Sequence, residues 1–183
     1  MSLFDLLGFA SAVTVRAKQL LQEVWRRGTT WDKGLPEDLT EEWKAWMTRL
    51  QSLNNVAIPR LYLEYSDAVN LQLHVFTDAS ESAYSAVLYW RATTPTDKVY
   101  LSLIIAKAKV AQVHKLLRAL AVGSRWLEPT SIPRLELQAA LMKARLAEAV
   151  LEEHPRKPDS KTYWTDSKTV LTWIKTGSWS YKL

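Results

Sequence analysis

LQLHVFTDAS, residues 71–80, alternates apolar and polar side chains up to a single acid, Asp78, near its end. Because successive side chains of a strand point to opposite faces, this alternation predicts a β-strand with one apolar face. Residues 162–167 (TYWTDS) form another strand-like segment, which also ends on an acid, Asp166. The two acids can lie close together only if the two strands are neighbours in one sheet.

The chain between these two segments predicts that the two strands are neighbours in one sheet. Residues 84–92 and 99–106 are strand-like and follow the first strand through tight turns, which is typical of an antiparallel meander. Residues 133–153 then predict a long helix that opens on a proline and carries Glu136 in its first turn. Because parallel pairing requires such a long connection, the sequence predicts a mixed α/β sheet with the two aspartates at adjacent strand ends.

The first third of the chain has helical periodicity and no catalytic chemistry. Residues 13–27 and 36–50 predict two amphipathic helices that pack through apolar stripes. A short strand is expected around residues 61–63. We therefore expect a helical connection segment at residues 1–66, followed by an α/β domain at residues 67–183.

Composition excludes several classes of protein. The 183 residues include no cysteine and only three scattered histidines, which excludes a disulfide framework and argues against a His-rich metal site. The net charge of +5 is unevenly placed: residues 1–70 carry 8 basic and 9 acidic residues, a net −1, whereas residues 71–183 carry 16 and 10, a net +6. Such a surface suits a polyanion held next to metal ions, although a solvated basic face without a partner fits the charge equally well. With no convincing signal peptide and no apolar run of ~18 residues, we expect a soluble, intracellular protein without membrane contact.

The three acids suggest a reaction class by their type. Carboxylates without histidine or cysteine are hard oxygen ligands, which suit Mg²⁺ or Mn²⁺. A pair of such ions about 3.5–4 Å apart activates a water and stabilises the leaving oxygen in phosphodiester hydrolysis. The alternative to a metal-binding role for Glu136 is that it is an ordinary first-turn glutamate, favoured only by the helix dipole.

Three motifs make this hypothesis more specific. FTDAS (76–80), IPRLEL (132–137) and WTDSK (164–168) occur in the order of a retroelement ribonuclease H. More closely, the chain resembles the ribonuclease H region of a Bel/Pao-type LTR retrotransposon polyprotein. TVRAK (14–18) and LPEDL (35–39) resemble the segment that lies between polymerase and ribonuclease H in that family. The resemblance implies a ribonuclease H-like fold and hydrolysis of the RNA strand of an RNA/DNA hybrid.

The resemblance also implies roles for individual residues. Asp78 would bridge two Mg²⁺ or Mn²⁺ ions, Glu136 would bind one of them, and Asp166 would complete the site. The expected partners are the RNA/DNA hybrid and the polymerase portion of the same polyprotein, in the cytoplasm within a virus-like particle, with the nucleus also possible. The weaker candidates for nucleic-acid contact are Ser80, Lys107, Lys109, Arg134 and Ser167. For the three basic residues among them, an ordinary charged surface is an equally good explanation.

The chain also departs from the family pattern. Residues 112–129 look like an insertion, expected as a loosely attached surface helix or loop. The chain ends at Leu183, before the family's final strand, last helix and fourth acid, and it lacks the polymerase core upstream. From this we expect weak binding of a single ion and slow or absent cleavage.

Three other functions stay open from the sequence. The first is a non-catalytic relic that binds nucleic acid. The second is an aspartic peptidase, which is less favoured because neither Asp78 nor Asp166 is followed by the glycine of an Asp-Thr/Ser-Gly turn. The third is a polynucleotidyl transferase of the integrase type, which would share the fold but fits the acid spacing less well.

Overall fold

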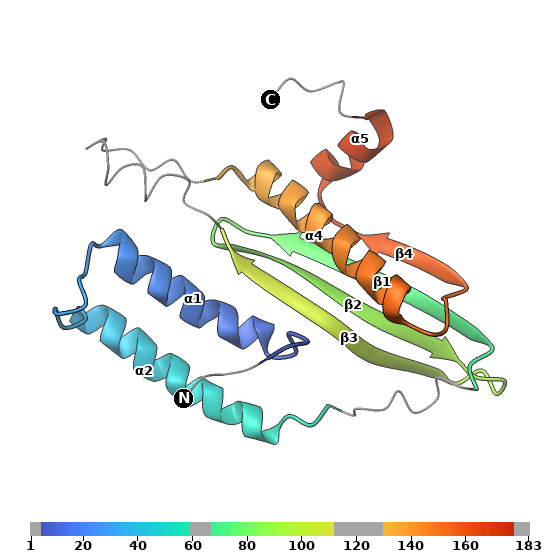
Figure 1. The fold of residues 1–183 in the computed structure, drawn as a ribbon, viewed down its shortest axis with the longest axis horizontal. Helices are drawn as coiled ribbons and strands as arrows, with labels where there is room; N and C mark the ends of the chain where they lie inside the picture. Colours follow the sequence, from blue (N-terminus) through green and yellow to red (C-terminus); the bar gives the residue numbers. More distant parts are fainter. Residues whose placement is uncertain (1–4, 59–66, 112–129, 178–183) are drawn as a thin grey trace.

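The computed structural model describes residues 5–58, 67–111 and 130–177, and its centre is a four-stranded sheet (Figure 1). β1 (Asn70–Ala79) pairs antiparallel with β2 (Ala83–Thr93), and β2 pairs antiparallel with β3 (Val99–Val110). β4 (Ser160–Trp164) lies on the other side of β1 and runs parallel to it, so the order is β3-β2-β1-β4. The predicted α/β class and the predicted parallel pairing of the two aspartate-bearing segments are confirmed.

The alternation that predicted β1 separates the two faces of the sheet. Leu71, Leu73 and Val75 are fully buried on one face, whereas Phe76 on the other face is 40% exposed. Because strand side chains alternate, Asp78 shares the more open face with Phe76. The buried face therefore makes the core, and the open face carries the acid.

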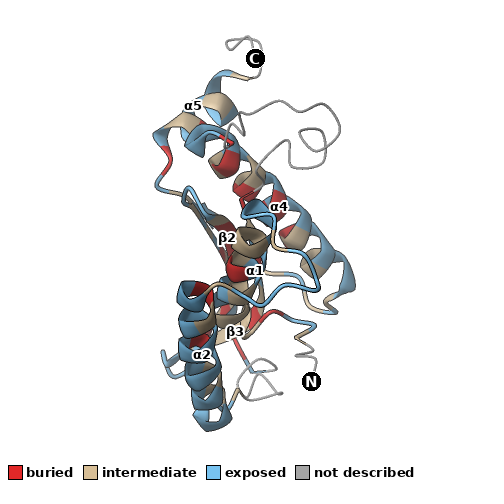
Figure 2. Cartoon of the chain, turned by 90° about the vertical axis from the view of Figure 1, so that its left-hand side faces the viewer, coloured by how far each residue is buried: buried red, intermediate tan, exposed pale blue. Residues whose placement is uncertain are grey.

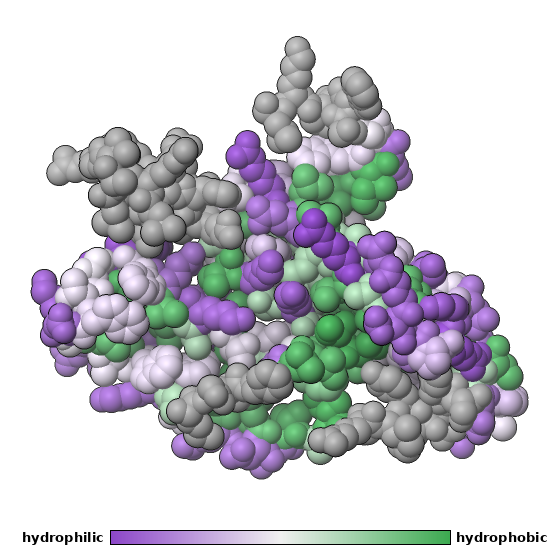
Figure 3. All heavy atoms as spheres, viewed as in Figure 1, coloured by the Kyte–Doolittle hydropathy of each residue, from purple (hydrophilic) through white to green (hydrophobic). Residues whose placement is uncertain are grey.

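α4 (Ile132–Glu153) covers the buried face, where it crosses β1 and β2 (Figure 1). Its fully buried residues, Leu135, Ala139 and Ala147, follow helical spacing. Two of the three are alanines, and such small residues let the helix approach the strands closely. Figure 2 shows the buried residues on the strands and on the inner side of α4, and Figure 3 shows hydrophobic residues gathered over the middle of the molecule.

The end of the described chain is fixed by two polar contacts around β4. Before the strand, a side-chain oxygen of Asp159 accepts a hydrogen bond from the Leu71 backbone N–H at 2.7 Å. After the strand, α5 (Lys168–Thr176) begins behind Ser167, whose hydroxyl accepts from the Val170 N–H at 3.1 Å. This is a standard helix N-cap, which satisfies an otherwise unpaired donor of the first turn.

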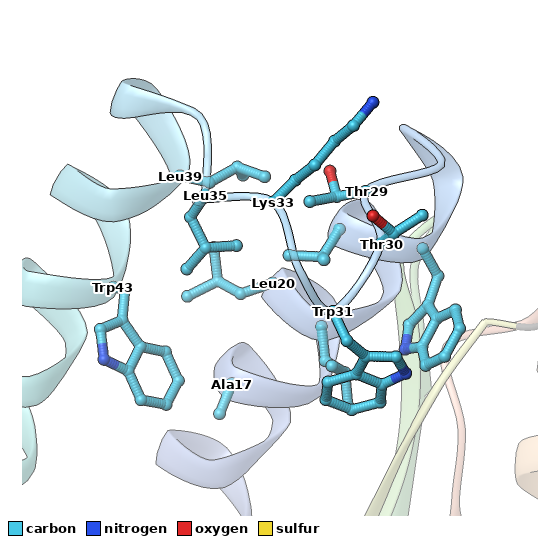
Figure 4. A pocket seen from close by; sticks show the side chains of 12 residues that line it. Ala17, Leu20, Thr29, Thr30, Trp31, Lys33, Leu35, Leu39 and Trp43 are labelled. Atoms are coloured by element: carbon cyan, nitrogen blue, oxygen red, sulfur yellow. The ribbon is translucent and has the colours of Figure 1, made fainter.

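The N-terminal part forms the two predicted helices, α1 (Ser11–Arg26) and α2 (Glu37–Gln51), followed by the 3₁₀ helix η1 (Ser52–Asn55). Leu20, Leu39 and Trp46 form a small core between them. The Trp46 indole N–H also donates to the Val13 carbonyl at 2.9 Å. Beside this core, the helices and their loop enclose an apolar pocket of about 310 Å³, whose wall includes Trp31 and Trp43 (Figure 4).

This helical pair contacts the sheet at the β3 edge. The Ala106 backbone N–H donates to the Leu7 carbonyl at 2.8 Å. The Gln22 side-chain amide donates to the Ala111 carbonyl at 2.7 Å. The pair is thus joined to the α/β part, and the domain boundary at residue 66 stays a prediction. The strand expected around residues 61–63 and the stretch 112–129 lie outside the described residues.

Gly8 leaves no space for a side chain against β3 and therefore yields a test of this docking. Its φ is +73°, and a Cβ built there would lie 1.7 Å from the Ala106 carbonyl oxygen. Because a left-handed backbone alone costs about 1–3 kcal/mol for a non-glycine residue, Gly8→Ala is expected to lower the free energy of unfolding by at least that amount. Urea unfolding measures the change. Gly28→Ala is the control, since Gly28 also has a positive φ of +64° but a Cβ there meets nothing within 4 Å, and an equal loss in both variants would contradict the docking.

Candidate functional site

Asp78 lies in β1 one residue before the strand ends, opposite Ser85 of β2. Its side chain is on the open face of the sheet and is exposed to solvent. One carboxylate oxygen accepts a hydrogen bond from the Ala79 backbone N–H at 2.8 Å. The carboxylate is therefore held at the strand end by its own main chain and remains accessible.

Asp166 follows the end of β4, the strand that lies parallel to β1. In the parallel ladder Phe76 of β1 pairs with Trp164 of β4, so Asp78 and Asp166 each lie two residues beyond the same pair. Both aspartates line one pocket of about 460 Å³. The structure thus brings together the two strand-end acids that the sequence singled out. The remaining residues of this pocket are Phe76, Thr77, Ser85, Val87, Trp164 and Thr165.

Glu136 does not line this pocket. It projects from the start of α4, and its Oε2 accepts a hydrogen bond from the Ser167 hydroxyl at 2.6 Å. Ser167 directly follows Asp166 in the chain. Within residues 5–58, 67–111 and 130–177, no three His, Cys, Asp or Glu side chains are grouped so that they could hold a metal ion. Two of the three predicted ligands therefore share a pocket, and the third is bound to the residue beside it.

The candidates for nucleic-acid contact are distributed more widely. Ser80 closes the turn between β1 and β2 through its hydroxyl and backbone, and Ser167 is the buried N-cap of α5. Both serines thus have structural contacts. Lys107 and Lys109 are exposed on β3, and Arg134 is exposed on α4. Contact with nucleic acid stays a prediction for all five residues.

Lys143 is a residue near the site that the sequence reasoning missed. It is only 4% exposed, and its Nζ donates to the Trp164 carbonyl at 3.3 Å. Its ammonium also lies 5.9 Å from the centre of the Tyr163 ring, and burial lowers the pKa of Lys143. The available signal was helical spacing, because Lys143 follows Leu135 by eight positions and Ala139 by four on the buried stripe of α4.

Aromatic rings form a second feature beside the pocket. The Phe76 and Trp164 rings stack across β1 and β4 with centroids 5.9 Å apart and planes 8° apart. The Trp164 indole N–H donates to Nδ1 of His74 at 3.1 Å, and Nε2 of His74 lies 3.3 Å from the Gln72 side-chain oxygen. This arrangement requires a neutral imidazole, because only the neutral ring has an acceptor nitrogen.

The neutral state of His74 predicts a pH dependence of stability. Burial and, secondly, the positive charge of Arg91 lower the pKa of His74 below its ordinary value of 6.5. A lowered pKa in the folded state contributes stability that is present above about pH 6.5 and is lost as the pH falls through the lowered value. We expect the thermal unfolding midpoint to drop between pH 7.5 and 5.5. The drop should be smaller in His74→Gln, and an equal drop in both proteins would contradict the assignment.

The mixed sheet, with α4 on one face and acids at neighbouring strand ends, defines a ribonuclease H-like α/β fold. A family model described as "Pao retrotransposon-like RNaseH-like domain" matches residues 1–167. The chain therefore belongs to this family, as its motifs predicted, and the family indicates a nuclease-type role in a retrotransposon. No curated protein matches the chain. Among the helices in the described ranges, none has the length and apolar character that crossing a membrane requires.

Proposed function

We propose that this chain hydrolyses the RNA strand of an RNA/DNA hybrid in a reaction that depends on Mg²⁺ or Mn²⁺. The observation that carries this proposal is the shared pocket of Asp78 and Asp166, with Glu136 hydrogen-bonded to the residue beside it. Family membership supports the nuclease class, and the specific substrate and the metal are the proposed parts.

The chemistry of the donor set fits a hard divalent cation. The pocket lining contains two carboxylates and three hydroxyl side chains, with no histidine or cysteine. Oxygen ligands of this kind suit Mg²⁺ and Mn²⁺ rather than Zn²⁺. Asp78, Asp166 and Glu136 would hold the cation. When bound, it would lower the pKa of a coordinated water and offset the charge that develops on the leaving oxygen.

The residues of the chain contribute position and charge to this reaction. β1 carries Asp78, and its parallel ladder with β4 ends at the pair Phe76–Trp164, two residues before Asp78 and two before Asp166. Glu136 uses Oε2 in its bond with Ser167, and this bond does not involve Oε1. The open pocket beside the rings of Phe76 and Trp164 leaves room for a phosphodiester group to approach the two exposed aspartates.

The proposed partners follow from charge and family. The net charge of +5 suits a polyanionic duplex, whose binding should weaken steeply as salt rises. The polymerase portion of the same polyprotein is the proposed protein partner, and the cytoplasm is the proposed location.

The test is a cleavage assay on matched duplexes. An RNA/DNA hybrid, a double-stranded RNA and a double-stranded DNA of one sequence are each labelled on one strand and incubated with Mg²⁺, with Mn²⁺ or with a chelator. We expect slow cleavage, restricted to the RNA strand of the hybrid and to the reactions that contain a cation. Cleavage that persists in the chelator, or that is equal for all three duplexes, would contradict the proposal.

A second candidate is a protein that binds the hybrid without cleaving it. The bond between Glu136 and Ser167 favours it, because this carboxylate is not grouped with the other two. Salt-sensitive binding of the hybrid without cleavage in either cation would favour this second function over the first.

A further inference from the structure

Lys143 is the only buried residue with a charged side chain in the described part of the molecule. It reaches from α4 to the end of β4, where its Nζ donates to the Trp164 carbonyl at 3.3 Å. The same carbonyl also accepts from the Thr77 hydroxyl of β1 at 3.4 Å. α4, β1 and β4 thus meet at one main-chain oxygen, two residues before Asp166.

An ammonium group is an unfavourable choice for this position on stability grounds alone. Removing a charge from water is costly, and an apolar side chain of similar length often fills such a site at equal or better stability. The lowered pKa of Lys143 reflects the same cost of burial. Among the described residues, the Trp164 carbonyl and the Tyr163 ring partly compensate the cation. Its presence therefore calls for a role other than packing.

The contacts of α4 provide that role. Glu136 and Lys143 are seven residues apart, which is close to two helical turns, so both side chains project from the same side of α4. Lys143 binds the carbonyl two residues before Asp166, and Glu136 binds the hydroxyl one residue after it. Asp166 is exposed and lies in the chain between the two residues, Trp164 and Ser167, that α4 binds through these hydrogen bonds.

We propose that Lys143 is a positioning residue, which fixes the backbone of Asp166 relative to Glu136 by binding the Trp164 carbonyl. This inference rests on the proposed function, because it treats Asp166 and Glu136 as parts of one site. Lys143 acts through the main chain and touches neither substrate nor cation. Its loss should therefore loosen the turn that carries Asp166 and leave the fold intact.

The first test compares Lys143→Met with Arg145→Met. Arg145 is exposed on the same helix, so both variants remove one positive charge from α4. In Lys143→Met the Trp164 carbonyl keeps its bond from Thr77, so we expect no loss in urea unfolding. Hydrogen exchange at the Ser167 and Val170 amides should be about tenfold faster. kcat should fall about tenfold or more with KM nearly unchanged, the scale seen when a group that orients a metal ligand is removed. Arg145→Met should change none of these quantities.

The second test restores the amine chemically. The chain has no cysteine, so Lys143→Cys introduces a single thiol that can be alkylated in urea with 2-bromoethylamine. The thiolate displaces bromide, and refolding gives a side chain with the length and ammonium of lysine. We expect this product to regain slow exchange at Ser167 and the wild-type kcat. The same protein alkylated with ethyl bromide, which adds no amine, should not.

The outcomes separate the two proposals. If the unmodified chain does not cleave the hybrid, the proposed function fails, and the exchange rates and their rescue by the amine still decide the role of Lys143. Exchange rates in Lys143→Met that equal those in Arg145→Met would overturn the positioning role. Global unfolding of Lys143→Met that the alkylated amine does not reverse would overturn it too, because the residue would then be part of the core.

Discussion

Asp78→Asn should lower the rate of RNA cleavage by at least about a hundredfold while the protein keeps its fold. The substitution preserves the shape of the side chain and one oxygen, but it removes the negative charge from the shared pocket. A bound cation stabilises the transition state by several kcal/mol, and each 1.36 kcal/mol corresponds to a tenfold change in rate. Because Asp78 is exposed and accepts a hydrogen bond only from the adjacent N–H among its described contacts, the unfolding free energy should change little.

Asp97→Asn is the matched control for this experiment. Asp97 is exposed in the turn between β2 and β3, at the opposite end of β2 from Ser85, the partner of Asp78. Its φ of 58° is a conformation that asparagine tolerates well. The control therefore removes the same charge from the same sheet, and its cleavage rate should be unchanged. Equal rates in both variants would place the catalytic site elsewhere.

Leu135→Ala should lower the free energy of unfolding by about 2–5 kcal/mol, the range for removing a large buried side chain. Leu135 is fully buried between α4 and the sheet, in a cluster with Tyr84, Ala86 and Ala139. It also directly precedes Glu136. The start of α4 is thus held on the sheet by the residue next to the predicted ligand.

Leu137→Ala makes the same chemical change two positions along the same helix. Leu137 is 37% exposed, so the loss in urea unfolding should be much smaller than for Leu135→Ala. Similar losses in the two variants would show that α4 does not contact the sheet through the face described above.

The central strands could be predicted because burial dictates their pattern. Leu71, Leu73 and Val75 alternate with polar residues, and the structure buries those three completely. The parallel neighbourhood of β1 and β4 followed from the long helix between them. The length of β3 was predicted less accurately, because the strand runs to Val110, four residues beyond the predicted end at residue 106. Contacts that are distant in sequence, such as the bond between Ala106 and Leu7, support that edge strand, and local periodicity does not record them.

The site was predictable in its residue types and less so in its side-chain contacts. The ends of two neighbouring strands brought Asp78 and Asp166 to one pocket, as their positions in the sequence indicated. The bond of Glu136 to Ser167 depends on side-chain conformation, which sequence periodicity does not specify. The pairing of His74 with Trp164 joins residues 90 positions apart, so only the ladder between β1 and β4 shows it.

A titration with Mn²⁺, followed by electron paramagnetic resonance, tests most directly whether Asp78 and Asp166 share a metal site. The signal of free Mn²⁺ falls as the ion binds, so the titration reports affinity without any need for cleavage. The expected result is that Asp78→Asn and Asp166→Asn each weaken binding by about tenfold or more, whereas Asp97→Asn binds like the unmodified chain. Equal affinity in all four proteins would contradict the shared site.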